Sequence, residues 1–256
     1  MKKRAMAAVS AVMCASMVLS ACGSSASTST TAAPAETKAA EETKAEETTA
    51  AAASGDVVTI NIGFENTTEE PIGQAVEKWA ELLKEESNGT MELKVFANSA
   101  LGNKSKLIDQ MVMGENVITI ADGAFYADYG VPDLGILYGP FFFDNWDEVW
   151  KLIDSDWYKE QCSKLADKGL TVLGSNWVYG ERELMTKDKA VVPADIKGKK
   201  IRLANSQIYV EGFNALGATA VPMALGDVYT ALQNGTLDGV ENPLSTLYGQ
   251  SFQEVT

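Results

Sequence analysis

The residue of this chain best suited to chemistry is Arg202, which stands between Ile201 and Leu203 in a short apolar segment. A guanidinium carries five N–H donors in a fixed fork and has no acceptor, so it suits a carboxylate bound through both oxygens. An arginine in a strand can equally pair with one of the protein's own acidic side chains. This segment therefore predicts either capture of an anion or an internal ion pair.

Three more polar side chains follow segments that have the pattern of strands. Glu65 and Asn66 come directly after the alternating apolar residues of 58–64, and Asp122 follows the apolar run of 117–121. Ligands of mainly parallel sheets collect at the carboxyl ends of the strands, so these residues stand where a site is expected. Because Asp122 precedes a glycine, a plain turn explains it equally well.

A group of aromatic and basic residues lies between two further strand patterns. Trp177 and Tyr179 follow an apolar run at 170–173, and Arg182 opens the segment at 182–186. This places two large rings and a second guanidinium at one strand end. We include these three residues among the candidates for ligand contact.

The elements that must position these residues follow from hydrophobic periodicity. The first helix has a Thr67–Glu70 capping box before it and Asn88-Gly89 after it. Residues 131–143 contain two prolines and are predicted to be a buried irregular segment or a strand. The predicted strands are at 58–64, 91–95, 117–121, 170–173, 182–186, 201–203, 219–223 and 237–240, and the predicted helices are at 72–83, 107–112, 146–153, 157–167, 206–215 and 227–234.

Alternation of strands and helices predicts an α/β fold with mainly parallel sheets. The alternation occurs twice, so we expect two lobes with a ligand cleft between them. Residues 56–178 would form the first lobe and residues 179–256 the second.

Composition excludes several classes of function. The chain has 35 acidic and 21 basic residues, a formal net charge of −14 and no histidine. Nucleic acid is excluded as a partner because phosphate binding needs clustered basic residues, and a Ser-His-Asp triad or a histidine-ligated zinc is impossible. An enzyme would need a carboxylate pair such as Glu65 with Asp122, or a lysine, and no acid/base motif supports an enzyme. We expect a protein that is not an enzyme and needs no metal or cofactor.

The N-terminus has the three parts of a secretory signal at residues 1–22: Lys2-Lys3-Arg4, an apolar run, and Leu19-Ser20-Ala21-Cys22. The last four residues resemble a bacterial lipobox, which predicts cleavage before Cys22 and lipidation of that cysteine. Residues 23–55 are rich in Ala, Thr, Ser and Glu and contain no aromatic residue, so we expect a disordered tether.

Several blocks of the sequence resemble one protein family. They are residues 89–102, Pro-Ala-Asp-Ile-Lys-Gly-Lys-Lys-Ile-Arg at 193–202, residues 216–218 with 222–223, and Asp-Val-Tyr-Thr-Ala-Leu-Gln-Asn-Gly-Thr-Leu-Asp-Gly-Val-Glu-Asn-Pro at 227–243. From about residue 57 onward the chain is similar to the solute-binding proteins of tripartite ATP-independent periplasmic (TRAP) transporters, of the dicarboxylate-binding, DctP-like type. The resemblance implies a two-lobed periplasmic binding-protein fold, type II-like.

The resemblance also implies roles for single residues. Arg202 would hold the substrate carboxylate, with Arg182 as a second arginine and Asn242 as a hydrogen-bonding partner. Glu65 stands where some sialic-acid binders have an asparagine, and Phe125 replaces an arginine of those binders, which argues against sialic acid. A carboxylate that also carries hydroxyl groups, such as a sugar acid or a hydroxy acid, fits two arginines and two acids better than a plain dicarboxylate.

On this basis we expect an extracytoplasmic lipoprotein, anchored to the bacterial cell membrane, that binds an organic acid as a monomer and delivers it to the TRAP permease subunits. Two alternatives remain: a binding protein of an ATP-driven importer, and a lipid-anchored carbohydrate-active enzyme. The family's chains continue beyond the equivalent of Thr256, so the second lobe is expected to be incomplete.

Overall fold

The computed structural model describes residues 56–256. The predicted signal at 1–22, the predicted lipidation site Cys22 and the predicted tether at 23–55 lie outside these residues. The assignment of 56–178 and 179–256 to two lobes stays a prediction.

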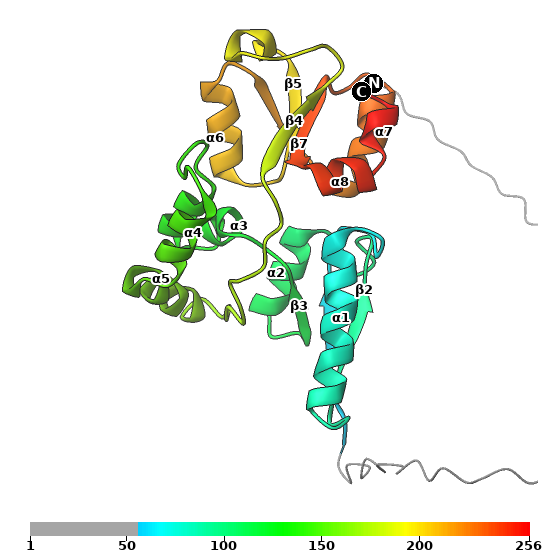
Figure 1. Ribbon diagram of the computed structural model, residues 1–256, viewed down its shortest axis with the longest axis vertical. Coiled ribbons are helices and arrows are strands. Elements are labelled where there is room, and N and C mark those ends of the chain that lie inside the picture. Colours follow the sequence, from blue (N-terminus) through cyan, green and yellow to red (C-terminus); the bar gives the residue numbers. More distant parts are fainter. Residues whose placement is uncertain (1–55) are drawn as a thin grey trace, which may run out of the picture. The chain divides into compact units, whose positions relative to one another are not determined.

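The first sheet consists of three parallel strands in the order β2-β1-β3, and Figure 1 labels two of them, β2 and β3. They are β1 (Val58–Gly63), β2 (Met91–Phe96) and β3 (Val117–Thr119), with Val58 opposite Met91 and Asn61 opposite Val117. Helices α1 (Pro71–Glu86) and α2 (Lys104–Val112) make the two crossovers. The predicted order of strand, helix, strand, helix, strand is confirmed.

The start and end of α1 are determined by local chemistry. Before the helix, the Thr67 amide donates to Glu70 Oε1 at 3.0 Å, and the Glu70 amide donates to Thr67 Oγ1 at 3.3 Å. These are the reciprocal bonds predicted for Thr67 and Glu70, but they close the turn before the helix, because the N-cap residue of α1 is Glu70 and no side chain caps it. After the helix, Asn88 and Gly89 have φ values of 51° and 77°, a left-handed conformation that ends helices.

The apolar stripe of α1 forms the core of the first sheet. Val76 packs with Ile62, Phe64 and Leu93, and Trp79 is partly buried against the same cluster. Burial of one such aliphatic or aromatic side chain stabilises a fold by about 1.5–3 kcal/mol. This core fixes the carboxyl end of β1, where two candidate residues stand.

A helical segment follows the first sheet. It contains α3 (Gly123–Asp128), the 3-10 helix η1 (Pro132–Tyr138), α4 (Trp146–Ile153) and α5 (Asp156–Ala166). Their shared core includes Ile108, Phe125, Leu134, Leu165 and Leu170, with Cys162 partly buried against it.

The second sheet has four strands in the order β4-β7-β5-β6, and Figure 1 labels β4, β5 and β7. Strand β4 (Arg182–Thr186) is antiparallel to β7 (Gly239–Pro243), which is parallel to β5 (Lys200–Leu203), and β5 is parallel to β6 (Thr219–Pro222). The antiparallel start of β4 therefore meets the carboxyl ends of the other strands. Helices α6 (Gln207–Ala215), α7 (Val228–Gln233) and α8 (Leu244–Gly249) and the 3-10 helices η2 (Pro193–Ile196), η3 (Leu225–Asp227) and η4 (Phe252–Glu254) complete this part.

The two faces of the second sheet have separate cores. Ile201 and Leu203 pack with Tyr209 of α6 on one face. Val240 packs with Leu232 of α7 and Leu247 of α8 in the other cluster. Since side chains alternate along a strand, Arg202 belongs to the face opposite Ile201 and Leu203.

Two sequence predictions about the residues between the two sheets are wrong. Residues 170–173 pair with no strand among the described residues, and Leu170 is buried in the helical core while Leu173 is exposed. The segment after Pro140 is not buried, because the side chain of Phe141 is 91% exposed and Phe142 is also exposed. A short apolar run indicates that its side chains favour burial. It does not show which strand the run would pair with, or which element would bury it.

Between residues 56 and 256, no helix combines the length and the apolar character that a membrane crossing requires. Over the same range, no group of three or more Cys, Asp or Glu side chains is placed to hold a metal ion.

Candidate functional site

Arg202 is a buried cation, and part of its guanidinium has no hydrogen-bond partner. Its residue is 2% exposed, and its Nε and Nη2 donate to the Met223 carbonyl oxygen at 2.9 and 2.6 Å. Its Nη1 is buried and has no hydrogen-bond partner, and no carboxylate of residues 56–256 lies within salt-bridge distance. Burial lowers the pKa of the guanidinium, and the charges of Glu241 and Glu65 oppose this effect. The structure thus lacks the internal ion pair that was the alternative explanation for Arg202.

Asn242 lies on the same sheet face as Arg202 and has a hydrogen-bond acceptor, which complements the donors of the guanidinium. Arg202 pairs with Val240 across β5 and β7, and Asn242 stands two residues further along β7, on the same face. Asn242 is 4% exposed, and its Oδ1 is buried without a partner. Nearly all buried polar atoms in proteins are hydrogen-bonded, so an unsatisfied donor and an unsatisfied acceptor on one face require an explanation.

Glu65 approaches this face from the loop after β1. Its Oε1 accepts a long bond of 3.4 Å from the Leu225 amide at the start of η3. The Glu65 charge also acts to raise the pKa of Arg202. The structure therefore brings Glu65 from the first sheet into the surroundings of Arg202.

Arg182 lies at the same sheet edge as Arg202 but on the opposite face, and its charge is already paired. Its Nε and Nη2 donate to the two carboxylate oxygens of Glu241 at 2.6 and 2.8 Å. The side chains are 19% and 4% exposed respectively. The guanidinium carbon also lies 4.8 Å from the ring centroid of Tyr209. Burial alone would lower the pKa of Arg182, but Tyr209 and Glu241 raise it above its ordinary value.

Asp122 caps α3, since its Oδ1 accepts from the Ala124 amide at 3.1 Å. Burial raises the pKa of its carboxyl, and the positive charges of Lys104 and Arg182 partly counteract this. Asp122 therefore forms the turn that was one explanation, and it also lies within electrostatic reach of Arg182.

Asn66 and Tyr179 belong to a buried polar network, which we call the joint network. Asn66 Nδ2 lies 2.7 Å from Glu70 Oε2 and 3.1 Å from each of the hydroxyls of Tyr179 and Thr246, so its two hydrogens are shared among these three acceptors. Tyr179 and Thr246 share a bond of 2.7 Å, and Gln250 donates to Glu70 at 2.8 Å. The network joins the loop after β1 to α8, so the polar groups of Asn66 and Tyr179 already have partners within the protein. Gly249 permits this approach, because a side-chain carbon there would collide with Glu70.

Trp177 is positioned by α1. Its ring packs edge-to-face on Trp79 with centroids 5.7 Å apart, beside a hollow of about 300 Å³. Among residues 56–256, no hydrogen bond or cation–π pair joins Trp177 to Arg202 or Arg182.

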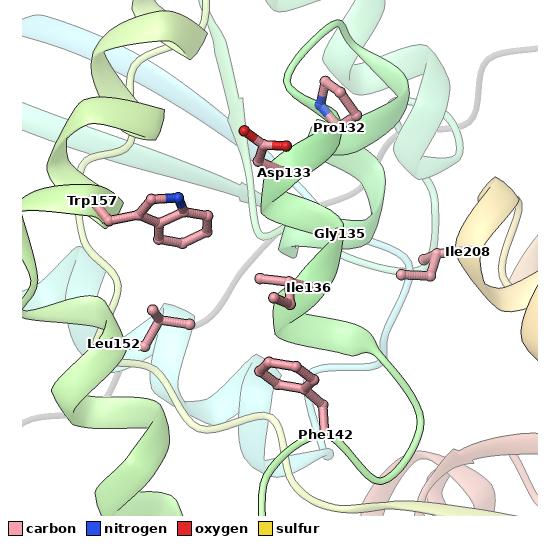
Figure 2. A pocket seen from close by; sticks show the side chains of 8 residues that line it. All are labelled: Pro132, Asp133, Gly135, Ile136, Phe142, Leu152, Trp157 and Ile208. Atoms are coloured by element: carbon pink, nitrogen blue, oxygen red, sulfur yellow. The ribbon is translucent and has the colours of Figure 1, made fainter.

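A larger hollow of about 580 Å³ lies elsewhere, and Figure 2 shows its lining. The lining comes from η1, α4, α5, α6 and the segment after η1, and it contains a single charged side chain, Asp133. None of the predicted ligand residues contributes to it. The full lining is Pro132, Asp133, Gly135, Ile136, Phe142, Leu152, Trp157 and Ile208.

Sequence reasoning missed Glu241, Glu70, Thr246 and Tyr209. Glu241 stands directly before Asn242 in a block that had attracted attention, but its pairing with Arg182 depends on the antiparallel register of β4 and β7. Glu70 was assigned to the capping box alone. Tyr209 gave no signal beyond its place in the first turn of a predicted helix.

Comparison with known proteins gives a consistent result. The sequence model of the family described as "Bacterial extracellular solute-binding protein, family 7" (DctP) matches residues 62–256. The C4-dicarboxylate-binding periplasmic protein DctP of Rhodobacter capsulatus is 31% identical over 185 residues, which are 72% of this chain and 55% of the relative. The 2,3-diketo-L-gulonate-binding periplasmic protein YiaO of Escherichia coli K12 is 32% identical over 199 residues, 77% of this chain and 60% of the relative.

A solved structure agrees in fold. A TRAP periplasmic solute-binding protein from Ochrobacterium anthropi with bound L-fuconate is 42% identical, with a TM-score of 0.75 over 78% of this chain and 66% of that chain. The chain thus spans a little over half of the length of the two curated relatives. All three proteins are named as binding proteins and none as an enzyme.

Proposed function

The chain belongs to family 7 of the bacterial extracellular solute-binding proteins, and we propose that it captures an organic acid outside the cytoplasm and delivers it to a TRAP-type membrane permease. The ligand class is a carboxylate that carries hydroxyl groups, a sugar acid or hydroxy acid, with dicarboxylates as the next candidates.

The observation that carries this proposal is the unpartnered Nη1 of Arg202, together with the unpartnered Oδ1 of Asn242 on the same sheet face. A buried polar group without a partner costs about 1–3 kcal/mol, and more if it is charged. A ligand with a carboxylate and an adjacent hydroxyl would satisfy both atoms, the carboxylate accepting from Arg202 and the hydroxyl donating to Asn242.

The charges around the site favour a single carboxylate. Glu241 neutralises Arg182 through a bidentate pair, whereas Arg202 has no carboxylate within 4.0 Å among residues 56–256. Glu65 and Asp122 add negative charge nearby. A second carboxylate on the ligand would meet these acids without a free cation of its own, whereas hydroxyl groups could donate to them.

The polar groups come from two sheets, which suggests how binding is coupled to closure. Glu65 and Asp122 follow strands of the first sheet, while Arg202 and Asn242 belong to the second. A ligand that contacts both sets stabilises the arrangement in which the sets are close, and its absence removes that stabilisation. The permease would then receive a closed, loaded protein.

The remaining parts of the proposal rest on the sequence. Cleavage before Cys22 and its lipidation would anchor the protein on the outer side of the cell membrane, with residues 23–55 as the tether. We propose that the protein acts there as a monomer.

Thermal-shift assays and titration calorimetry on the full chain test the proposal. The ligands are L-fuconate, 2,3-diketo-L-gulonate and succinate, with the neutral sugar L-fucose as the matched control for L-fuconate. At a hundred times its dissociation constant, a ligand should stabilise the protein by about 2.7 kcal/mol. Absence of binding by every acid, or equal binding of L-fucose, would contradict the proposal.

A further inference from the structure

Among residues 56–256, the Tyr209 hydroxyl is the third buried side-chain atom without a hydrogen-bond partner, after Arg202 Nη1 and Asn242 Oδ1. The residue is 5% exposed, and its hydroxyl is buried without a hydrogen-bond partner. It stands in the first turn of α6, which two bonds fix against α3. Ser206 Oγ donates to the Ala124 carbonyl at 2.8 Å, and the Gln207 amide donates to Asp128 at 3.3 Å.

Tyr209 lies on the sheet face of Arg182, at the same sheet edge as Arg202 but on the opposite face. The guanidinium of Arg182 lies over its ring, and the ring of Tyr138 packs edge-to-face with a centroid distance of 6.0 Å. Burial and the charge of Asp122 raise the pKa of the Tyr209 hydroxyl well above its ordinary value. The hydroxyl therefore stays protonated at physiological pH and can both donate and accept.

Two other tyrosines with buried or partly buried rings have partners for their hydroxyls, and Tyr209 is the tyrosine of residues 56–256 whose hydroxyl is fully buried without one. Tyr126 donates to the Ala121 carbonyl at 3.1 Å, and the Tyr158 hydroxyl lies 2.7 Å from Ser175 Oγ. A buried hydroxyl without a partner destabilises a protein, and phenylalanine would fill the same volume without that cost. The hydroxyl of Tyr209 thus calls for a partner that the protein itself does not supply.

We propose that Tyr209 determines specificity by hydrogen-bonding a hydroxyl group of the bound acid. This rests on the proposed function, and it adds a residue that recognises the uncharged part of the ligand. Arg202 can only donate and Asn242 Oδ1 can only accept, whereas a phenol does both, as a ligand hydroxyl requires. Tyr209 thereby favours hydroxylated acids over plain dicarboxylates.

The test compares Tyr209→Phe with Tyr158→Phe in the full chain. Both changes remove one hydroxyl from a buried ring, but the Tyr158 hydroxyl is already bonded to Ser175. Titration calorimetry with L-fuconate should show about 10- to 100-fold weaker binding for Tyr209→Phe. Tyr158→Phe should bind like the wild type. The melting temperature of ligand-free Tyr209→Phe should be unchanged or higher.

Three results would overturn this inference. One is L-fuconate binding by Tyr209→Phe that equals that of the wild type. Another is a loss of affinity together with a lower melting temperature, which would mark a structural role. In the third, the wild type binds succinate but neither L-fuconate nor 2,3-diketo-L-gulonate, which leaves capture of organic acids intact while removing hydroxyl recognition. If the wild type binds none of these acids, the proposed function falls as well.

Discussion

Replacement of Glu241 by glutamine tests how the charges of the site are balanced. Glu241→Gln keeps the size of the side chain and one acceptor oxygen, but it removes the charge that pairs with Arg182 at 2.6 and 2.8 Å. Loss of one partner from a buried ion pair destabilises a protein by about 3–5 kcal/mol. Because Arg182 is 19% exposed and also stacks on Tyr209, we expect the low end, about 3 kcal/mol.

For a protein of this size, 1 kcal/mol shifts the melting temperature by about 2–4 °C. Glu241→Gln should therefore melt about 6–12 °C below the wild type. Binding should change in the opposite direction, because the released charge of Arg182 becomes available to a second carboxylate. Succinate should bind more tightly to Glu241→Gln than to the wild type.

The matched control is Glu183→Gln, the same change at an exposed position of β4. Thermal unfolding followed by circular dichroism measures stability, and titration calorimetry with succinate measures affinity. The reasoning is refuted if Glu241→Gln has the same melting temperature as Glu183→Gln. It is also refuted if Glu241→Gln binds succinate more weakly than the wild type does.

Two further variants address Asp122 and the joint network. Burial raises the pKa of Asp122 in the folded protein above its unfolded value of about 3.9, so the folded state holds the proton to higher pH and ionisation destabilises it. Asp122→Asn can keep the helix cap and should be more stable than the wild type at pH 7. Thermal melts at decreasing pH should show that this difference in stability vanishes near pH 4. A difference that stays constant with pH would contradict the prediction. Tyr179→Phe removes the hydrogen bond to Thr246 and should lower the free energy of unfolding, measured by chemical denaturation, by about 1–2 kcal/mol. Its affinity for L-fuconate should stay within about threefold of the wild type. A tenfold loss of affinity would instead show that Tyr179 contacts the ligand.

Much of the fold could be predicted from periodicity. The alternation at 58–64 and the apolar stripe of 72–83 predicted β1 and α1 because each pattern has one geometric solution that buries its apolar side chains. The apolar run at 170–173 had no such solution, since Leu170 is covered by helices and no described strand pairs with the segment. A local sequence pattern does not show which distant elements will bury a segment.

The candidate site was predictable in its residue types but not in its pairings. Arg202 could be chosen because an arginine between Ile201 and Leu203 is chemically conspicuous. Its actual partner is the backbone carbonyl of Met223, and a carbonyl carries no sequence signal. Likewise, pairing of Arg182 with Glu241 needed the register of β4 against β7. Tertiary contacts of this kind decide which charged groups remain free for a ligand.

Titration calorimetry of L-fuconate against the wild type and Arg202→Ala tests the central claim most directly. Removal of the guanidinium leaves a bound carboxylate without its charged partner, which costs about 3–5 kcal/mol, or a factor of roughly 150 to 5,000 in affinity. We predict a loss in this range for Arg202→Ala, while the variant remains folded. Binding within tenfold of the wild type would contradict the claim that Arg202 holds the carboxylate.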